Sequence, residues 1–155
     1  MENKRCAFFG HREILITREL YATVSAEIEK SVDFGCRIFY FGGYGAFDRL
    51  CYEIVTELQA KNPNMGIKRL YCVPLESQIR RPGRYFSPED YDNVIYLEPS
   101  VNWWYKSIYY RNIAMVDECD YIIFYADSIP TSGAYKAYKY AKKKSEKIVI
   151  NLFRA

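Results

Sequence analysis

Three short stretches of the chain combine glycine with polar side chains in a way that favours binding of an anion. Gly10-His11-Arg12, Gly42-Gly43-Tyr44-Gly45 and Pro130-Thr131-Ser132-Gly133 each follow an apolar run. Glycine lets a ligand approach the backbone N–H groups, and the N-terminus of a following helix carries a partial positive charge. The chemistry that these stretches predict is therefore the binding of a phosphate group.

The glycine turn at residues 42–45 has two interpretations. It is either a tight connection between a strand and a helix, or a cradle for phosphate. Its spacing matches neither the dinucleotide fingerprint G-x-G-x-x-G nor the P-loop, since no Gly-Lys-Ser/Thr follows. Asp48 lies in the first turn of the next predicted helix. Its carboxylate interacts there with the helix dipole alone, or it binds a ribose hydroxyl.

The other polar candidates also have two interpretations each. His11, the only histidine, is either a packed loop residue or a functional group, and Arg12 could hold a phosphate with paired hydrogen bonds. Thr131 and Ser132 offer two hydroxyls, of which an ordinary N-cap needs one. Arg111 and Asn112, inside a predicted helix, either point to the same edge or are solvated.

Alternating strands and helices must position these residues. We predict strands at residues 5–9, 37–41, 68–74, 93–97, 121–126 and 148–152, and helices at 17–33, from the glycine turn to Asn62-Pro63, at 101–119 and at 132–143. This order predicts an α/β fold: a Rossmann-like, doubly wound, mostly parallel sheet with helices on both faces. Residues 1–155 then form a single domain, whose ligand sits at the carboxyl ends of the strands.

Composition limits the functional classes. The net charge of +3 on 155 residues would not by itself bring the chain to nucleic acid or to a membrane surface. No secretory leader and no apolar run of about 20 residues is visible, so we expect a cytoplasmic location. The five scattered cysteines show no metal-binding or redox spacing. We expect them to be reduced and buried, with no metal and no cofactor.

Two further groups of residues each have more than one interpretation. Lysines 136, 139, 142, 143, 144 and 147 are typical of a solvated helix end, with a nucleic-acid surface as the alternative because tyrosines lie between them. Trp103, Trp104 and Tyr105 fit a core or a subunit interface, or base stacking. The aromatic excess around Trp103, Trp104, Tyr109 and Tyr110 predicts a homodimer or higher homo-oligomer.

Several motifs in order resemble the SLOG superfamily, which contains the LOG phosphoribohydrolases, the DNA-processing DprA proteins and small bacterial members. "CAFFGHRE" is similar to their first-strand signature and "FYFGGYGAFDRL" to their glycine turn with its aspartate. "YRNIAMVDECDYIIFY" followed by "PTSGAYKAYKYAKK" resembles their C-terminal half. The resemblance covers nearly the whole chain. It implies a Rossmann-like domain that binds a nucleotide or an ADP-ribose-like molecule, and relatives of this fold serve as sensors in antiphage defence.

The resemblance also bears on catalysis. LOG enzymes use an arginine, matched here by Arg111, and a glutamate after the fifth strand, where this chain has Lys136 and Ala137. Cleavage of an N-glycosidic bond passes through a cationic sugar that a carboxylate stabilises. We therefore expect binding without turnover, for sensing or sequestration. A LOG-like phosphoribohydrolase with Arg111 and an unidentified acid is the alternative, and single-stranded DNA binding is a weaker third. The expected ligand-binding residues are Gly10, His11, Arg12, Gly42, Gly43, Tyr44, Gly45, Asp48, Arg111, Asn112, Thr131, Ser132 and Gly133.

Overall fold

The computed structural model describes residues 3–43, 45–80, 86–99 and 106–154. Within these ranges six strands form one sheet in the order β4-β3-β2-β1-β5-β6, and every neighbouring pair is parallel. The strands are β1 (Lys4–Gly10), β2 (Cys36–Phe41), β3 (Lys68–Val73), β4 (Asn93–Tyr96), β5 (Tyr121–Tyr125) and β6 (Ile148–Asn151). The predicted α/β, doubly wound class is confirmed, and the described sheet is entirely parallel.

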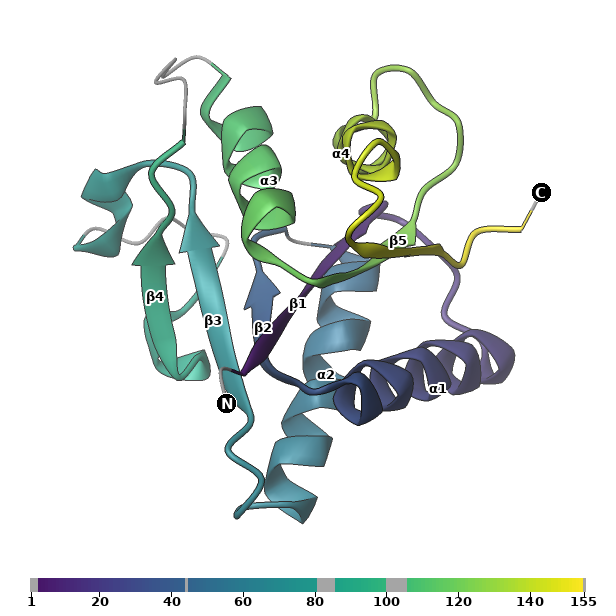
Figure 1. Ribbon diagram of the computed structural model, residues 1–155, viewed down its shortest axis with the longest axis vertical. Helices are drawn as coiled ribbons and strands as arrows, with labels where there is room; N and C mark the ends of the chain where they lie inside the picture. The colour runs from purple at the N-terminus through teal and green to yellow at the C-terminus, as the bar shows by residue number, and fades with distance from the viewer. Residues whose placement is uncertain (1–2, 44, 81–85, 100–105, 155) are drawn as a thin grey trace.

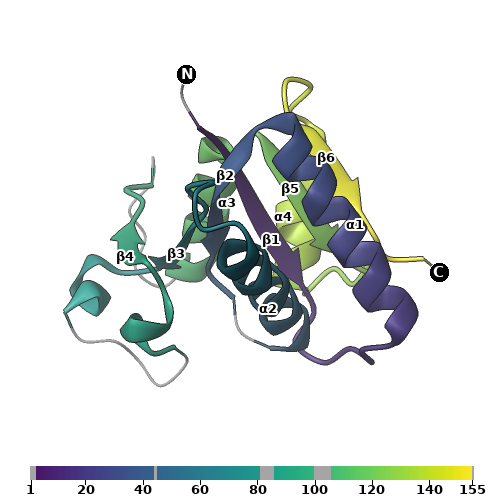
Figure 2. The same cartoon turned by 90° about the horizontal axis from the view of Figure 1, so that it is seen from below.

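Helices cover both faces of this sheet. α1 (Arg18–Phe34) and α2 (Ala46–Lys61) pack on one face, while α3 (Ser107–Glu118) and α4 (Gly133–Lys142) pack on the other. Figures 1 and 2 show the two pairs on opposite sides of β1. Each face has its own apolar core, because strands buried on both sides direct alternate side chains to opposite helix layers. Phe8 and Phe39 belong to the first core, and Phe9 and Phe124 to the second.

Local signals in the sequence account for several helix ends. The Thr17 hydroxyl accepts a hydrogen bond from the Leu20 N–H and begins α1, and Gly35 ends it with a left-handed φ of 117°. The Ser132 hydroxyl accepts from the Tyr135 N–H at the start of α4. These caps explain why the predicted boundaries of α1 and α4 lie within a residue or two of the structure.

The third predicted helix is described only in part. Residues 101–105, where the sequence predicts its start, lie outside the described residues, and α3 runs from Ser107 to Glu118. Trp103, Trp104 and Tyr105, expected in a core or an interface, lie outside the described residues. Between β3 and β4, the described residues include two 3₁₀ turns, Glu76–Ile79 and Pro88–Asp90.

The strand order creates a point where the chain changes direction across the sheet. From the central β1 the chain adds β2, β3 and β4 to one side, and then returns to place β5 and β6 on the other. In open parallel sheets a crevice opens at the carboxyl ends of the two strands flanking such a point. Here those strands are β1 and β5, which end at Gly10 and Tyr125.

The structure also describes the state of the cysteines and the lengths of the helices. All five cysteines are buried and free of disulfides, as expected. In the described part of the chain, none of the helices has the length and apolar character needed to cross a bilayer.

Candidate functional site

A cleft of about 950 Å³ lies at the carboxyl ends of the central strands. Its walls come from the loops after β1, β2 and β5, from the first two turns of α3, from the first turn of α4, and from the segment after β3. The cleft brings together eleven of the thirteen expected residues: Gly10, His11, Arg12, Gly42, Gly43, Asp48, Arg111, Asn112, Thr131, Ser132 and Gly133. Residues far apart in the sequence therefore share one hollow.

Of the other two expected residues, Tyr44 lies outside the described residues, and Gly45 is not part of the cleft lining. Gly45 is the N-cap of α2, and its φ of 117° falls in the left-handed region. A Cβ there would stand 2.5 Å from the Cα of Arg12, while the Ala46 N–H donates to the Arg12 carbonyl at 2.7 Å. Gly45 therefore joins α2 to the loop after β1.

Gly10 and Gly42 are also needed for packing between elements. A Cβ on Gly10 would lie 2.3 Å from the Phe47 ring, and one on Gly42 would lie 3.0 Å from Arg111 Cζ. At Gly43, by contrast, the nearest atom would be Asp48 Oδ1 at an ordinary 3.7 Å. The first two glycines thus make room for side chains of the protein itself, whereas a Cβ on Gly43 would make only an ordinary contact with Asp48.

Arg111 is a buried cation that lines the cleft. Its side chain is 7% exposed, and Nε and Nη2 donate to Asn112 Oδ1 at 3.2 and 2.9 Å. Burial lowers the pKa of Arg111, opposed chiefly by Tyr71, Cys72 and Asp48. Among the described residues, no carboxylate oxygen lies within 4.0 Å of its guanidinium. Asp48 therefore acts on Arg111 only from beyond 4.0 Å, and a buried charge without a closer counter-ion is costly. An anionic ligand would supply that closer counter-ion.

Asn112 extends this donor group toward α4. Because its Oδ1 accepts both bonds from Arg111, its Nδ2 amide must point the other way. Nδ2 lies 3.9 Å from the position of a Cβ on Gly133, and has no acceptor among the described residues. The residue is only 6% exposed and lines the cleft. An amide donor therefore faces the cleft beside the N-terminus of α4.

His11 connects the loop after β1 to the loop before α4. The Asp127 N–H donates to Nε2 at 2.7 Å, and Nδ1 lies 3.4 Å from the Ser132 hydroxyl. Since Nε2 accepts, the imidazole proton resides on Nδ1, which can donate to Ser132. His11 thus orients the first turn of α4, whose backbone N–H groups are suited to an anion. Its position favours a structural role within the site.

Asp48 gives the cleft a sheltered carboxyl group. Its Oδ1 is buried with no hydrogen-bond partner. Burial raises the pKa of Asp48 to about 7, partly opposed by the charge of Arg111 and by a hydrogen bond from the Gly43 backbone. The Gly43 N–H, expected to hold a phosphate, is therefore directed at this carboxyl. Asp48 is better suited to accept from a hydroxyl than to neighbour a phosphate.

Aromatic rings at two ends of the cleft were missed by the sequence reasoning. At one end Phe86 stacks on Tyr71, with ring centroids 4.0 Å apart and planes 12° from parallel. At the other end Phe153 meets Tyr125 edge to face at 5.4 Å. All four rings line the cleft. Strand residues such as Tyr71 and Tyr125 look like ordinary core in sequence, so no local signal marked them.

The donor set suits an organic anion better than a metal ion. Among the described residues, no three His, Cys, Asp or Glu side chains stand close enough together to hold a metal. The cleft instead combines a guanidinium, an amide and a helix N-terminus.

Neither protein-family models nor curated proteins give a match to this chain.

Proposed function

We propose that the protein binds a nucleotide-derived small molecule, of the ADP-ribose class, in this cleft without turning it over. The observation that carries the proposal is Arg111, a buried cation that faces the cleft with no carboxylate within 4.0 Å in the described chain. Binding of a phosphate would neutralise it and add charge-assisted hydrogen bonds. Such a protein acts as a sensor or as a sequestering protein.

The remaining groups of the cleft would bind different parts of the ligand. A phosphate would bind Arg111, the Asn112 amide and the N–H groups at Gly133, where charge and donors converge. A ribose hydroxyl would donate to Asp48. The rings of Phe86 and Phe153, at opposite ends, would pack on a base and on a second ring system. A cleft of about 950 Å³ is near the upper end of ordinary ligand pockets, which favours a two-part ligand over a mononucleotide.

The motif resemblance to the SLOG superfamily supports the same ligand class and adds a biological setting. We propose a cytoplasmic location, where reduced thiols such as the five here persist. Signalling in antiphage defence, or interference with it, is the setting that we propose.

Calorimetry tests the binding. AMP, ADP-ribose and cyclic ADP-ribose isomers are titrated into the wild type, Arg111→Met and the control Arg49→Met, whose arginine is exposed on α2. We expect Arg111→Met to weaken binding by at least about 2 kcal/mol, or thirtyfold, because charge-assisted bonds are lost. The control should bind normally. Equal affinity of the wild type and Arg111→Met would overturn the proposal.

One observation favours a second candidate, the N-glycoside hydrolase. The carboxyl of Asp48 has a pKa of about 7 and lines the cleft, so it can supply the acid that the sequence reasoning left unidentified. Chromatography after long incubation separates the two functions. Ligand recovered intact supports binding alone, whereas release of free base that is lost in Asp48→Asn would establish the hydrolase.

A further inference from the structure

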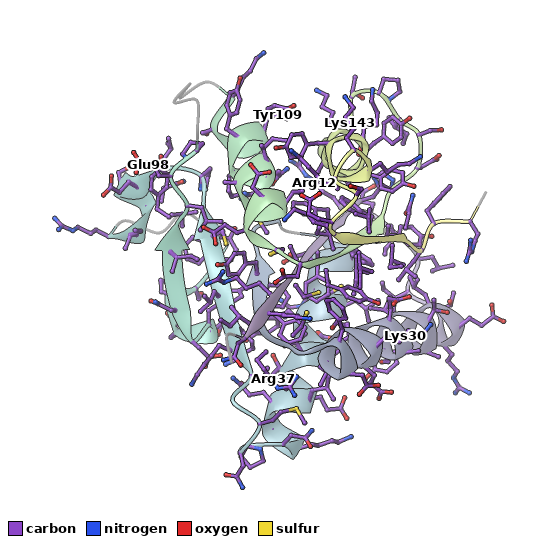
Figure 3. All side chains as sticks on the ribbon, in the orientation of Figure 1. Arg12, Lys30, Arg37, Glu98, Tyr109 and Lys143 are labelled. Atoms are coloured by element: carbon purple, nitrogen blue, oxygen red, sulfur yellow. The ribbon has the colours of Figure 1, made fainter. Side chains whose placement is uncertain are left out.

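A second hollow lies outside the cleft, between α3 and α4. This Lys–Tyr groove has a volume of about 560 Å³. It is lined by Lys106, Tyr109, Tyr110, Lys136, Lys139, Tyr140 and Lys143. In Figure 3, Tyr109 projects from α3 and Lys143 from α4, away from the sheet. Its lining consists entirely of cationic and phenolic side chains, and none of them is required by the proposed function.

The lysines on α4 have no carboxylate to neutralise them. Lys136, Lys139 and Lys143 are all exposed, and in the described chain none lies within 4.0 Å of a carboxylate oxygen. The sequence has no Asp or Glu between Asp127 and Glu146. Lysines three and four residues apart on one helix repel each other, at a cost of a few tenths of a kcal/mol per pair. The net charge of the whole chain is only +3, so it does not indicate this local concentration of positive charge.

The helix dipole accounts for only part of this pattern. Cations are favourable in the last turn of a helix, where Lys139 and Lys142 lie. Lys136, however, is four residues after the Ser132 N-cap, at the positive end of α4. Its place there is unfavourable to α4 itself and adds to the charge of the groove. An anion in the groove would offset both this cost and the repulsion between the lysines.

The length and the ends of the groove point to a compact ligand. Lys136 and Lys143 are separated by about 10 Å along the helix axis, farther than one phosphate can bridge. A polymer would need cations that remain available beyond them. Beyond Lys143, Lys147 Nζ instead donates to the carbonyls of Asp117 and Cys119 at 2.9 and 2.7 Å, and Lys144 Nζ lies 4.8 Å from the centre of the Tyr140 ring. The Tyr140 hydroxyl in turn donates to Asp117 Oδ1 at 2.7 Å. The protein's own groups therefore engage the lysines beyond Lys143.

We propose that the Lys–Tyr groove is a second anion site, separate from the cleft, for a compact ligand that carries a chain of three or more phosphates. Lysine ammonium groups bind successive phosphates as point charges. The phenol hydroxyls of Tyr109 and Tyr110 can donate to phosphate oxygens along the opposite wall. An inorganic phosphate chain and a nucleoside triphosphate share this chemistry.

An NMR titration of the ¹⁵N-labelled full chain with sodium tripolyphosphate at low ionic strength tests the site. We expect amide shifts at Tyr110, Lys139 and Lys143, and the same shifts in Arg111→Met, which disables the cleft. The result is thus independent of the proposed function. Shifts confined to cleft residues such as Gly43 and Gly133, or no shifts at all, would overturn the second site.

A matched pair of double variants tests the charges. Lys139→Gln with Lys143→Gln should raise the dissociation constant for tripolyphosphate by at least about tenfold, since two ammonium–phosphate contacts are lost. Lys30→Gln with Lys68→Gln makes the same change in net charge at exposed positions on α1 and β3, and should have little effect. Figure 3 shows Lys30 on α1, far from Lys143. Equal losses in both pairs would mean a general charge effect and would overturn the proposal.

Two further probes identify the source of the phosphates. ATP that binds more tightly than tripolyphosphate identifies a nucleotide ligand, and ATP that binds equally identifies the phosphate chain alone. Both results support the site. A single-stranded oligonucleotide that binds more tightly than ATP would show a nucleic-acid surface and would overturn the compact-ligand proposal.

Discussion

At the scale of single residues, Asp48 makes stability depend on pH in an unusual direction. Its pKa is raised from 3.8 to about 7 in the native state by burial. Between these values the native state keeps a proton that the unfolded state releases, so the free energy of unfolding falls as pH rises from about 4 to about 7. The change expected from this group is about 2–4 kcal/mol. Urea unfolding of the wild type and Asp48→Asn across this range measures it.

Asp48→Asn should remove this pH-dependent contribution and raise stability at pH 8. Asp33→Asn, at an exposed position on α1, serves as the control and should keep the pH dependence of the wild type. A pH dependence of unfolding in Asp48→Asn that equals the wild type's would contradict the assignment.

Arg111 is the residue whose removal should separate stability from binding. Its buried guanidinium contacts Asn112 but has no carboxylate partner within 4.0 Å in the described chain. Replacing such a charge with an apolar side chain of similar length is commonly neutral or stabilising, here by up to about 1–2 kcal/mol. We expect Arg111→Met to be at least as stable as the wild type while it loses ligand binding. Thermal unfolding reads the stability, and a large drop in melting temperature would indicate a structural role instead.

At the scale of elements, the glycines should fall into two classes. Gly45→Ala forces a left-handed φ on alanine and places its Cβ 2.5 Å from the Arg12 Cα, so we expect a loss of at least about 2 kcal/mol. Gly43→Ala meets only an ordinary contact and should change stability by less than about 1 kcal/mol. Urea unfolding of both variants distinguishes the classes, and equal losses would contradict this division.

The element order and the meeting of distant polar residues could be predicted from the sequence. Apolar runs bounded by glycine and by capping residues such as Thr17 mark strands and helices locally, and a parallel sheet brings their carboxyl ends to one edge. The side chain that packs against a glycine cannot be predicted from the neighbouring sequence. Gly10 faces the Phe47 ring and Gly42 faces Arg111, and neither partner is adjacent in sequence. For the same reason, the stacking of Phe86 on Tyr71 could not be predicted from the sequence.

At the scale of the whole molecule, the predicted homo-oligomer stays a prediction. Tyr109 and Tyr110 are two of the residues on which that prediction rests, and both line the Lys–Tyr groove. Three large apolar side chains stand around the cleft and are strongly exposed: Leu15 at 82%, Ile108 at 53% and Ile129 at 44%. We expect a second copy to cover part of this surface. Light scattering that shows a monomer at high micromolar concentration would exclude it, and Leu15→Glu should weaken the association.

The central position of β1 has a consequence for the order in which the molecule folds. β1 can pair with β2 early, but its pairing with β5 joins residues 115 positions apart, as the bond from the Arg5 N–H to Asp120 shows. Such distant pairing is slow because a long loop must close first. The bond between His11 and Asp127 forms only when that step is complete. A ligand of the cleft should therefore slow unfolding in stopped-flow measurements and leave the rate of refolding unchanged.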